Sequence, residues 1–288
     1  MDRRQFTLSC LGAGVSAVLP QTAAAATPAS SVTEPMPTLV SNFTNVARSA
    51  NKRHIAFLVY DGMTLLDLVG PMETLSNANF DVDFVSHSLA PVYAESRSNK
   101  RLGVLPTVTF ADLKQTDILF CPGSSDPLAP LKQPELIDWV ANVGAKAEWV
   151  TSVCSGAMIL GAAGLLNGYQ ATSHWGWLDK LRYFGAKPTQ ARVVHDRNRV
   201  TGAGVTSGID FGLVLLSLLL DETTAKIRQL GLEYDPQPPF ACGSVTQAPA
   251  AMVSQSRNAY QAFLAQVEPQ QQQLLEGYAA KLKVDLAG

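Results

Sequence analysis

The sequence predicts an α/β fold in which helices cover both faces of a doubly wound, mostly parallel β-sheet. Two strand-like segments, 54–60 and 117–125, contain continuous apolar runs (IAFLVY and ILF), which are typical of strands buried on both faces. Segments with helical spacing of apolar residues alternate with such strands along the chain. With 288 residues, 47% of them hydrophobic, the chain can bury the core of one large domain. The pattern leaves the order of the strands open.

The charge and cysteine content exclude several classes of protein. The formal net charge is −2, and Lys and Arg form no run. We therefore expect no nucleic-acid partner and no binding to anionic membranes. Four cysteines, Cys10, Cys121, Cys154 and Cys242, are too widely spaced for a zinc motif or a disulfide framework, so we expect no metal site.

Residues 1–26 predict a cleavable export signal. Arg3 and Arg4 precede an apolar run, 8–19, and small residues follow it, which is the order of charged, apolar and small parts in signal peptides. The paired arginines favour the twin-arginine route, and the run is too short to span a bilayer. We therefore expect an exported, periplasmic protein. Its predicted organisation is a signal peptide at 1–26, a flexible leader at 27–51, the α/β domain at 52–249 and a C-terminal helix packed on that domain at 250–288.

The first half of the domain predicts a strand followed by a helix that carries Asp67. This residue lies in the first turn of the helix, just beyond the strand, where open parallel sheets place their ligand sites. Pro71 predicts a kink near Gly70 or a helix that restarts at the proline. We expect strands at 54–60, 81–88, 92–96, 103–110 and 117–125, the last of which ends in a glycine-containing turn, and helices at 65–78 and 134–145.

The second half continues the alternation. Three prolines in 235–240 forbid regular pairing and predict an extended segment. Gly185 is expected to end an amphipathic helix. We expect strands at 149–153 and 169–175, a hairpin at 191–204 with its turn at 196–198, and helices that start at 155 and span 176–186, 205–220, 221–234 and about 250–282.

Cys154 lies on a predicted strand-to-helix turn. A β-branched run stops at this cysteine, and Ser155 and Gly156 open a long segment of helical composition. Helix amides directed at the side chain favour a thiolate, the nucleophilic form of cysteine. The turn resembles a nucleophile elbow, although Ser152 occupies the position where a glycine would relieve crowding. The alternative is an inert buried thiol, which is a common fate of cysteine beside apolar residues.

Three turns are expected to meet at the carboxyl edge of the sheet, at 61–67, 122–125 and 153–156. They would bring a carboxyl group, a pair of backbone amides and a thiol into one crevice. A thiol with amide donors suits attack on an electrophilic carbon that gains negative charge, and a carboxyl group can move the proton.

Several blocks of the sequence resemble the isonitrile hydratases, in the ThiJ/PfpI branch of the class I glutamine amidotransferase-like superfamily. The resemblance covers about 53–249 and rests on the blocks FLVYDGMTLLDLVGPMETL, ILFCPG, VTSVCSGAMILGAAGLLNGYQATSHW, GVTSGIDF and LGLEYDPQPPF. It implies a flavodoxin-like fold, a homodimer, and a cofactor-free enzyme that hydrates a small isonitrile to an N-substituted formamide through a thioimidate.

The resemblance also implies roles for individual residues. It places the nucleophile at Cys154, the essential carboxylate at Asp67, and the hydroxyl residue that follows the nucleophile, usually threonine, at Ser155. Gly123 and Ser124 fall in the oxyanion-binding turn. Serine at 124 replaces a second glycine of the family, which leaves the substrate more open than the nucleophile.

Other polar residues receive weaker assignments. His174 is either near the crevice, where it would bind substrate, or a hydrogen-bonded structural residue. Asp210 is expected to cap or pin its helix. We interpret the remaining side chains of this kind as structural, surface or unpaired residues: His54, His87, His195, Cys121 and Cys242.

Two rival functions remain beside the hydratase. The first is a non-catalytic or redox-sensing protein in which Cys154 is oxidised and a partner detects the change. The second is the ligand-sensing half of a transcription regulator, which the export signal and the absence of a helix-turn-helix pattern after Gly243 disfavour. Peptidase activity is disfavoured because Ser155 stands where proteases of this superfamily have a histidine near the cysteine.

Overall fold

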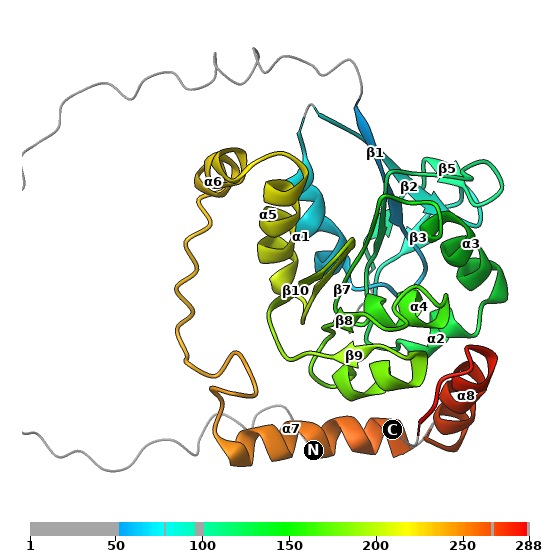
Figure 1. Cartoon of the computed structure of the whole chain (residues 1–288). Coiled ribbons are helices and arrows are strands. Elements are labelled where there is room, and N and C mark those ends of the chain that lie inside the picture. Colours follow the sequence, from blue (N-terminus) through cyan, green and yellow to red (C-terminus); the bar gives the residue numbers. More distant parts are fainter. Residues whose placement is uncertain (1–51, 78, 96–100, 266–267, 287–288) are drawn as a thin grey trace, which may run out of the picture. The chain divides into compact units, whose positions relative to one another are not determined.

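The computed structural model describes residues 52–77, 79–95, 101–265 and 268–286 (Figure 1). The predicted signal peptide and leader, 1–51, lie outside the described residues and stay predictions. The folded unit that follows contains one central sheet with helices on both of its faces, so the predicted fold class is confirmed.

Seven strands form the central sheet in the order β10-β11-β7-β6-β1-β2-β5. All neighbours pair in parallel except β10 and β11, which form the expected hairpin. Two small two-stranded sheets, β3 with β4 and β8 with β9, lie outside it. The bounds are β1 (Arg53–Leu58), β2 (Phe80–Ser86), β3 (Val92–Tyr93), β4 (Gly103–Val104), β5 (Val108–Thr109), β6 (Ile118–Cys121), β7 (Trp149–Val153), β8 (Gln170–Ala171), β9 (Lys187–Pro188), β10 (Val193–Asp196) and β11 (Arg199–Gly202).

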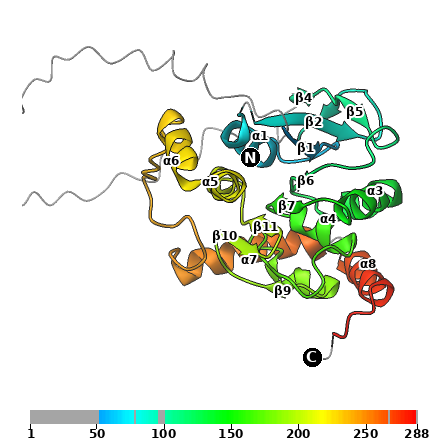
Figure 2. The ribbon, with the colours of Figure 1, turned by 45° about the horizontal axis from the view of Figure 1, so that its top comes forward.

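Two groups of helices flank the central sheet, one on each of its faces (Figure 2). One group contains α1 (Leu65–Leu75), α5 (Ser207–Leu219) and α6 (Glu222–Gly231). The other contains α2 (Leu128–Leu131), α3 (Pro134–Gly144), α4 (Gly156–Ala162) and the 3-10 helix η3 (Leu178–Phe184). Because both faces are covered, the central strands β1 and β6 bury apolar side chains on each side, including Phe57 and Phe120, which are 0% exposed.

The crossing of α1 and α5 fixes the helix that carries Asp67. A methyl group at Gly208 would lie 2.9 Å from Cδ of Pro71, and one at Gly212 would overlap Oγ1 of Thr74. The two helices can approach this closely because α5 has glycine at both positions. The tight contact holds α1 in one place against the sheet.

Pro71 lies inside α1, so the predicted restart of the helix at this residue was wrong, while a kink near Gly70 stays a prediction. The helix runs without interruption from Leu65 to Leu75. Proline removes one hydrogen bond, the one its own N–H would donate to the carbonyl of Asp67. The proline ring packs against Gly208 of α5, and α1 continues past the missing hydrogen bond.

Three further expectations differ from the structure. The helix after Cys154 ends at Ala162, and Gly164 then adopts a φ of 75°. The predicted strand at 169–175 pairs only over Gln170–Ala171. Helix α6 ends at Gly231, before the end of the expected helix at 221–234, and the side chain of Asp221 caps its start by accepting a hydrogen bond from the Thr224 amide at 2.8 Å.

The C-terminal segment forms two helices, where one was predicted. They are α7 (Ala250–Ala265) and α8 (Glu268–Lys281). Helix α8 packs on the domain: Leu275 is 0% exposed, and the Tyr278 hydroxyl donates to the carbonyl of Leu131 at 2.7 Å. None of the helices in the described part of the chain has the length and hydropathy needed to cross a membrane.

Candidate active site

The three turns singled out in the sequence meet at the carboxyl edge of the sheet. The Thr64 amide donates to the carbonyl of Gly123 at 2.8 Å, which joins the turn after β1 to the turn after β6. Two hydrogen bonds between Ser155 and the backbone of Ser124 join the latter turn to the one after β7. The site is therefore a set of turns bonded to one another, as the sequence predicted.

Cys154 occupies a sharp turn between β7 and α4. Its φ is 59°, in the left-handed region that a residue with a Cβ rarely adopts and that costs about 1–3 kcal/mol. The Cys154 amide donates to the carbonyls of Gly202 and Ala203, at 3.0 and 2.8 Å. The following Gly156 lies so close to the Cys121 carbonyl that any Cβ there would clash with it. These contacts maintain the strained conformation, and the predicted elbow is present.

Asp67 lies beside this cysteine. Its carboxyl group is 0% exposed, and Oδ2 accepts a hydrogen bond from the Gly123 amide at 3.1 Å. Burial raises the pKa of Asp67 to about 7, although hydrogen bonds from the Cys154 thiol and the Gly123 amide oppose the shift. Oδ1 of Asp67 is buried and has no hydrogen-bond partner among the described residues. The carboxyl group can thus both release and accept a proton near neutral pH, and it retains an oxygen for a further partner.

Burial of the Cys154 side chain opposes the thiolate that the helix amides were expected to favour. The residue is 4% exposed. Burial and the neighbouring charge of Asp67 raise the pKa of Cys154 well above its ordinary value, and the amide of Ser155 opposes this only in part. The thiol lies within hydrogen-bonding reach of the Asp67 carboxyl, so a base for its proton is adjacent.

Ser155 connects two turns through its hydroxyl. Oγ accepts a hydrogen bond from the Ser124 amide at 2.9 Å and donates one to the Ser124 carbonyl at 2.8 Å. Since the hydroxyl proton and a lone pair are both used, the side chain is placed to hold the turn at 122–125.

The two amides expected to bind an oxyanion are both engaged. The Gly123 amide binds Asp67, and the Ser124 amide binds Ser155. The described non-glycine residues with positive φ do not include Ser124, so serine fits here without left-handed strain. A methyl group at Gly123 would lie 2.5 Å from the Ser155 amide nitrogen and 2.9 Å from Oδ2 of Asp67. Glycine at 123 is therefore needed for the carboxyl group to approach the backbone.

Sequence reasoning missed two hydroxyl groups that hold the site. The buried Tyr60 hydroxyl donates to the Pro122 carbonyl at 3.0 Å. The Ser173 hydroxyl donates to the carbonyl of Cys154 itself at 2.8 Å. Both residues lie within the sequence blocks FLVYDG and ATSHW, but nothing in their spacing indicates these long-range contacts.

His174 is bonded locally. Its Nδ1 accepts from the Gly176 amide at 3.2 Å, and its ring lies 5.4 Å from that of Trp175. Burial lowers the pKa of His174, which favours the neutral ring. A Cβ at Gly204 would lie 3.1 Å from Cδ2 of this histidine, so the ring is near the strand end that bonds to Cys154. The contacts fit the structural reading, and a substrate-binding role stays a prediction.

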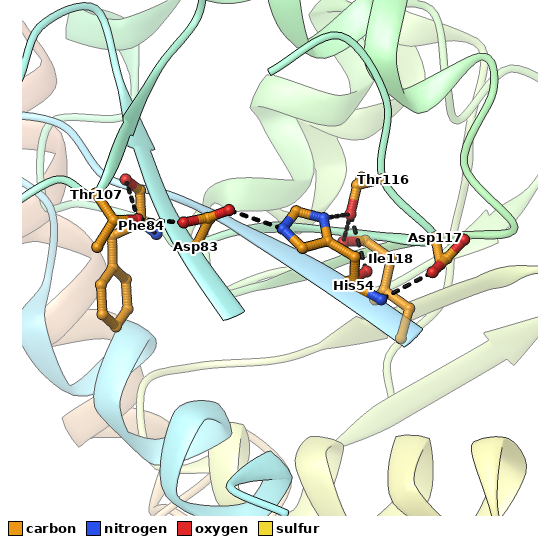
Figure 3. Close-up of polar contacts among 7 residues, drawn as sticks. All are labelled: His54, Asp83, Phe84, Thr107, Thr116, Asp117 and Ile118. Atoms are coloured by element: carbon orange, nitrogen blue, oxygen red, sulfur yellow. Dashed lines mark hydrogen bonds and ion pairs between the residues drawn. The ribbon is translucent and has the colours of Figure 1, made fainter. Parts of the chain in front are cut away.

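His54 belongs to a polar network on the sheet (Figure 3). Its Nδ1 lies 2.9 Å from Oγ1 of Thr116, and its Nε2 lies 2.9 Å from Oδ2 of Asp83. Thr107 donates to the other oxygen of Asp83 at 2.6 Å. The network joins β1 to β2 and to the loop before β6, which is a structural role.

Asp210 pins its helix, as expected. Its Oδ2 accepts from Nε of Arg192 at 2.6 Å and from the Tyr234 hydroxyl at 2.8 Å. The contacts tie α5 to Arg192, directly before β10, and to the segment after α6. Among the described residues, no group of three or more His, Cys, Asp or Glu side chains could hold a metal ion.

Comparison with known proteins identifies the family to which the chain is similar. Residues 53–218 match the DJ-1/PfpI family. An isonitrile hydratase of Pseudomonas putida is 41% identical over 204 residues, which cover 70% of this chain and 88% of that protein. A transcriptional regulator of Pseudomonas aeruginosa is 29% identical over 165 residues, which cover 56% of this chain but 49% of the regulator.

Solved structures agree with the sequence matches. A ThiJ/PfpI family protein from Pseudomonas syringae superposes with a TM-score of 0.72 at 43% identity, over 86% of this chain and 98% of that one. Schizosaccharomyces pombe DJ-1 shares the fold, with a TM-score of 0.53 at 19% identity over 64% of this chain and 100% of that one. The turns, the elbow and these matches lead to one conclusion: this chain belongs to the DJ-1/PfpI family.

Proposed function

We propose that this protein hydrates isonitriles, R–N≡C, to N-substituted formamides, with Cys154 as the nucleophile and Asp67 as the group that moves protons. The observation that carries the proposal is the thiol–carboxyl pair, in which a buried thiol faces a carboxyl group with a pKa of about 7. The 41% identity to an isonitrile hydratase supports the choice of substrate class.

The first step forms a thioimidate. In the reactive form the thiol of Cys154 keeps its proton and Asp67 is ionised, so that the pair holds one proton. Asp67 takes this proton as the sulfur attacks the terminal carbon of the isonitrile, and then delivers it to the same carbon. The C–S and C–H bonds form, and the product is the thioimidate R–N=CH–S–Cys154. The single negative charge returns to Asp67, so the buried site gains no further charge.

The second step adds water. Asp67, now ionised, takes a proton from a water molecule that attacks the thioimidate carbon, and passes it to the substrate nitrogen. The tetrahedral adduct R–NH–CH(OH)–S collapses as its C–S bond breaks. The hydroxyl proton returns to the Asp67–Cys154 pair, and the formamide R–NH–CHO leaves. Oδ1 of Asp67, which has no partner among the described residues, is the oxygen available to this water.

The remaining groups hold the pair in place. We assign Ser155, Gly123 and Tyr60 to the geometry of the turn at 122–125, because their polar atoms are bonded within the site. Neither step requires a cofactor or a metal ion.

The proposal is tested by the identity of the product. Purified protein incubated with cyclohexyl isocyanide in ¹⁸O-labelled water should yield N-cyclohexylformamide with the label in the formyl oxygen. Absence of this product over the background reaction contradicts the proposed activity.

A redox sensor is the alternative, in which peroxide oxidises Cys154 to a sulfenic or sulfinic acid. The thiolate is the form that reacts with peroxide, and burial raises the pKa of the Cys154 thiol, which lowers the fraction of thiolate. The 41% identity to an isonitrile hydratase favours the hydratase. A peroxide-dependent mass gain at Cys154, with no formamide produced, would instead favour the sensor.

Export and dimerisation are further parts of the proposal. The arginine pair and apolar run in 1–26 support export by the twin-arginine route. Cell fractionation tests this, since a mature protein in the periplasmic fraction is expected and a full-length cytoplasmic one would contradict it. The family resemblance supports a homodimer, which light scattering of the purified protein checks.

A further inference from the structure

Glu95 lies in the segment after β3, beside the turn that leads to Asp67. Its backbone amide donates to the carbonyl of Met63 at 2.9 Å, and its side chain is half-buried. Neither the sequence pattern nor the family resemblance indicated this residue.

The two carboxylate oxygens of Glu95 bind two different turns. Oε1 accepts from the Thr64 hydroxyl at 2.7 Å, and Oε2 accepts from the Ser125 amide at 2.8 Å. Thr64 immediately precedes the helix of Asp67, and Ser125 follows the turn whose Gly123 amide binds Asp67. One carboxylate thus joins the segments on both sides of the catalytic carboxyl group.

The charge of Glu95 also acts on the pair. It raises the pKa of Asp67, after the larger effect of burial, and contributes to the raised pKa of Cys154. Within the described residues, the charges that shift the pKa values of these two groups are carboxylates. Asp67 and Glu95 raise the pKa of the Cys154 thiol, and Glu95 raises the pKa of Asp67.

We propose that Glu95 is a positioning and specificity-determining residue, which holds the two turns around Asp67 and makes the crevice select neutral isonitriles over anionic ones. The inference rests on the proposed isonitrile hydration and names its substrate class. A substrate carboxylate would bring a further negative charge next to Glu95 and the ionised Asp67, and repulsion between like charges in a partly buried site disfavours this. A neutral substrate does not meet this repulsion.

Two probes of nearly equal size test the charge preference. Methyl isocyanoacetate is neutral, and isocyanoacetate carries a carboxylate beside the same reacting group. The wild-type protein should have the higher kcat/KM for the ester. Glu95→Gln should raise the kcat/KM ratio of anion to ester by about threefold or more, since one negative charge is removed. Glu135→Gln, an exposed glutamate of α3, is the matched control and should leave the ratio unchanged.

The pH profile separates the charge from a purely structural role. Without the Glu95 charge the pKa of Asp67 falls, so the rise of kcat/KM for the ester should move to lower pH in Glu95→Gln. Glu95→Asp keeps the charge and should keep both the ratio and the profile, even if the shorter side chain lowers the rate.

Each remaining outcome is decisive. If Glu95→Gln slows both probes equally with an unmoved profile, Glu95 only holds the turns and the specificity proposal is overturned. If Glu95→Gln does not fold, the wild-type protein still decides: added salt should raise kcat/KM for the anion relative to the ester, and an unchanged ratio overturns the proposal. If the wild-type protein hydrates neither of the two probes and does not hydrate cyclohexyl isocyanide, the result contradicts the proposed function and not the role of Glu95.

Discussion

The thiol of Cys154 lies within hydrogen-bonding reach of the fully buried carboxyl group of Asp67. Burial raises the pKa values of both groups, so a neutral thiol and a carboxyl group that titrates near pH 7 stand side by side. The pair can move one proton without creating a charge-separated intermediate in a buried site. This pair and the contacts around it determine how activity and stability should respond to pH and to substitution.

The pH dependence of hydration should report the ionisation of Asp67. The reactive pair needs an ionised carboxyl group next to a protonated thiol. We therefore expect kcat/KM for cyclohexyl isocyanide to rise with pH through an apparent pKa of about 7. Steady-state rates across the pH range check this, and a profile that is flat between pH 5 and pH 8 would exclude Asp67 as the base.

Asp67→Asn should abolish hydration and stabilise the fold at alkaline pH. The folded-state pKa of Asp67 is raised, so the folded state holds a proton between pH 3.8 and about 7 that the unfolded state has lost. The buried carboxyl group therefore lowers the free energy of unfolding as pH rises through this window. We expect the variant to gain about 1–4 kcal/mol over the wild type at pH 8 and little at pH 3.5. Urea denaturation at both pH values measures the difference, and a gain that does not depend on pH would show that the buried charge of Asp67 is not its cause.

Ser155→Ala should lower both stability and activity. The substitution leaves the buried amide and carbonyl of Ser124 without their partner, which costs about 1–3 kcal/mol for each group that stays unpaired. The loosened turn also carries the Gly123 amide that binds Asp67. Ser155→Thr keeps the hydroxyl and serves as the matched variant. Equal kcat/KM and equal melting temperatures for alanine and threonine at this position would show that the hydroxyl does not hold the turn.

Asp83→Asn tests the network around His54, away from the active site. Burial opposes ionisation of Asp83, but hydrogen bonds from Thr107 and His54 outweigh it and lower its pKa. A lowered pKa stabilises the fold above the unfolded-state value of 3.8, and this stabilisation is lost as pH falls through the folded-state pKa. The variant should therefore be less stable than the wild type at pH 7 and equally stable at about pH 2, while its hydration rate is unchanged. If the variant is also less stable than the wild type at low pH, the loss of stability comes from altered packing and not from the lost charge.

The elements most accurately predicted from sequence are those with strong local patterns. The strands β1 and β6 contain continuous apolar runs, and α3 has a proline at its start with apolar residues at helical spacing. Their bounds in the structure lie close to those expected. The approach of Asp67 to Cys154 was also predictable, since the ends of neighbouring parallel strands must meet at one edge of a sheet.

The remaining features depend on contacts between distant parts of the chain. The uninterrupted α1 relies on Gly208 of α5, which accommodates the ring of Pro71. The raised pKa of Cys154 follows from burial, which a local helix signal does not reveal. Glu95 and Tyr60 reach the site through hydrogen bonds to residues about 30 and 60 positions away, so no periodicity marks them.

The most direct test of the account compares two cysteine variants with the wild type. Cys154→Ala removes the proposed nucleophile, and Cys242→Ala, at a partly exposed free cysteine, is the matched control. We predict that kcat/KM for cyclohexyl isocyanide falls by about a thousandfold or more in Cys154→Ala and stays at the wild-type value in Cys242→Ala. Formamide production by folded Cys154→Ala at a rate near that of the wild type would contradict the central claim.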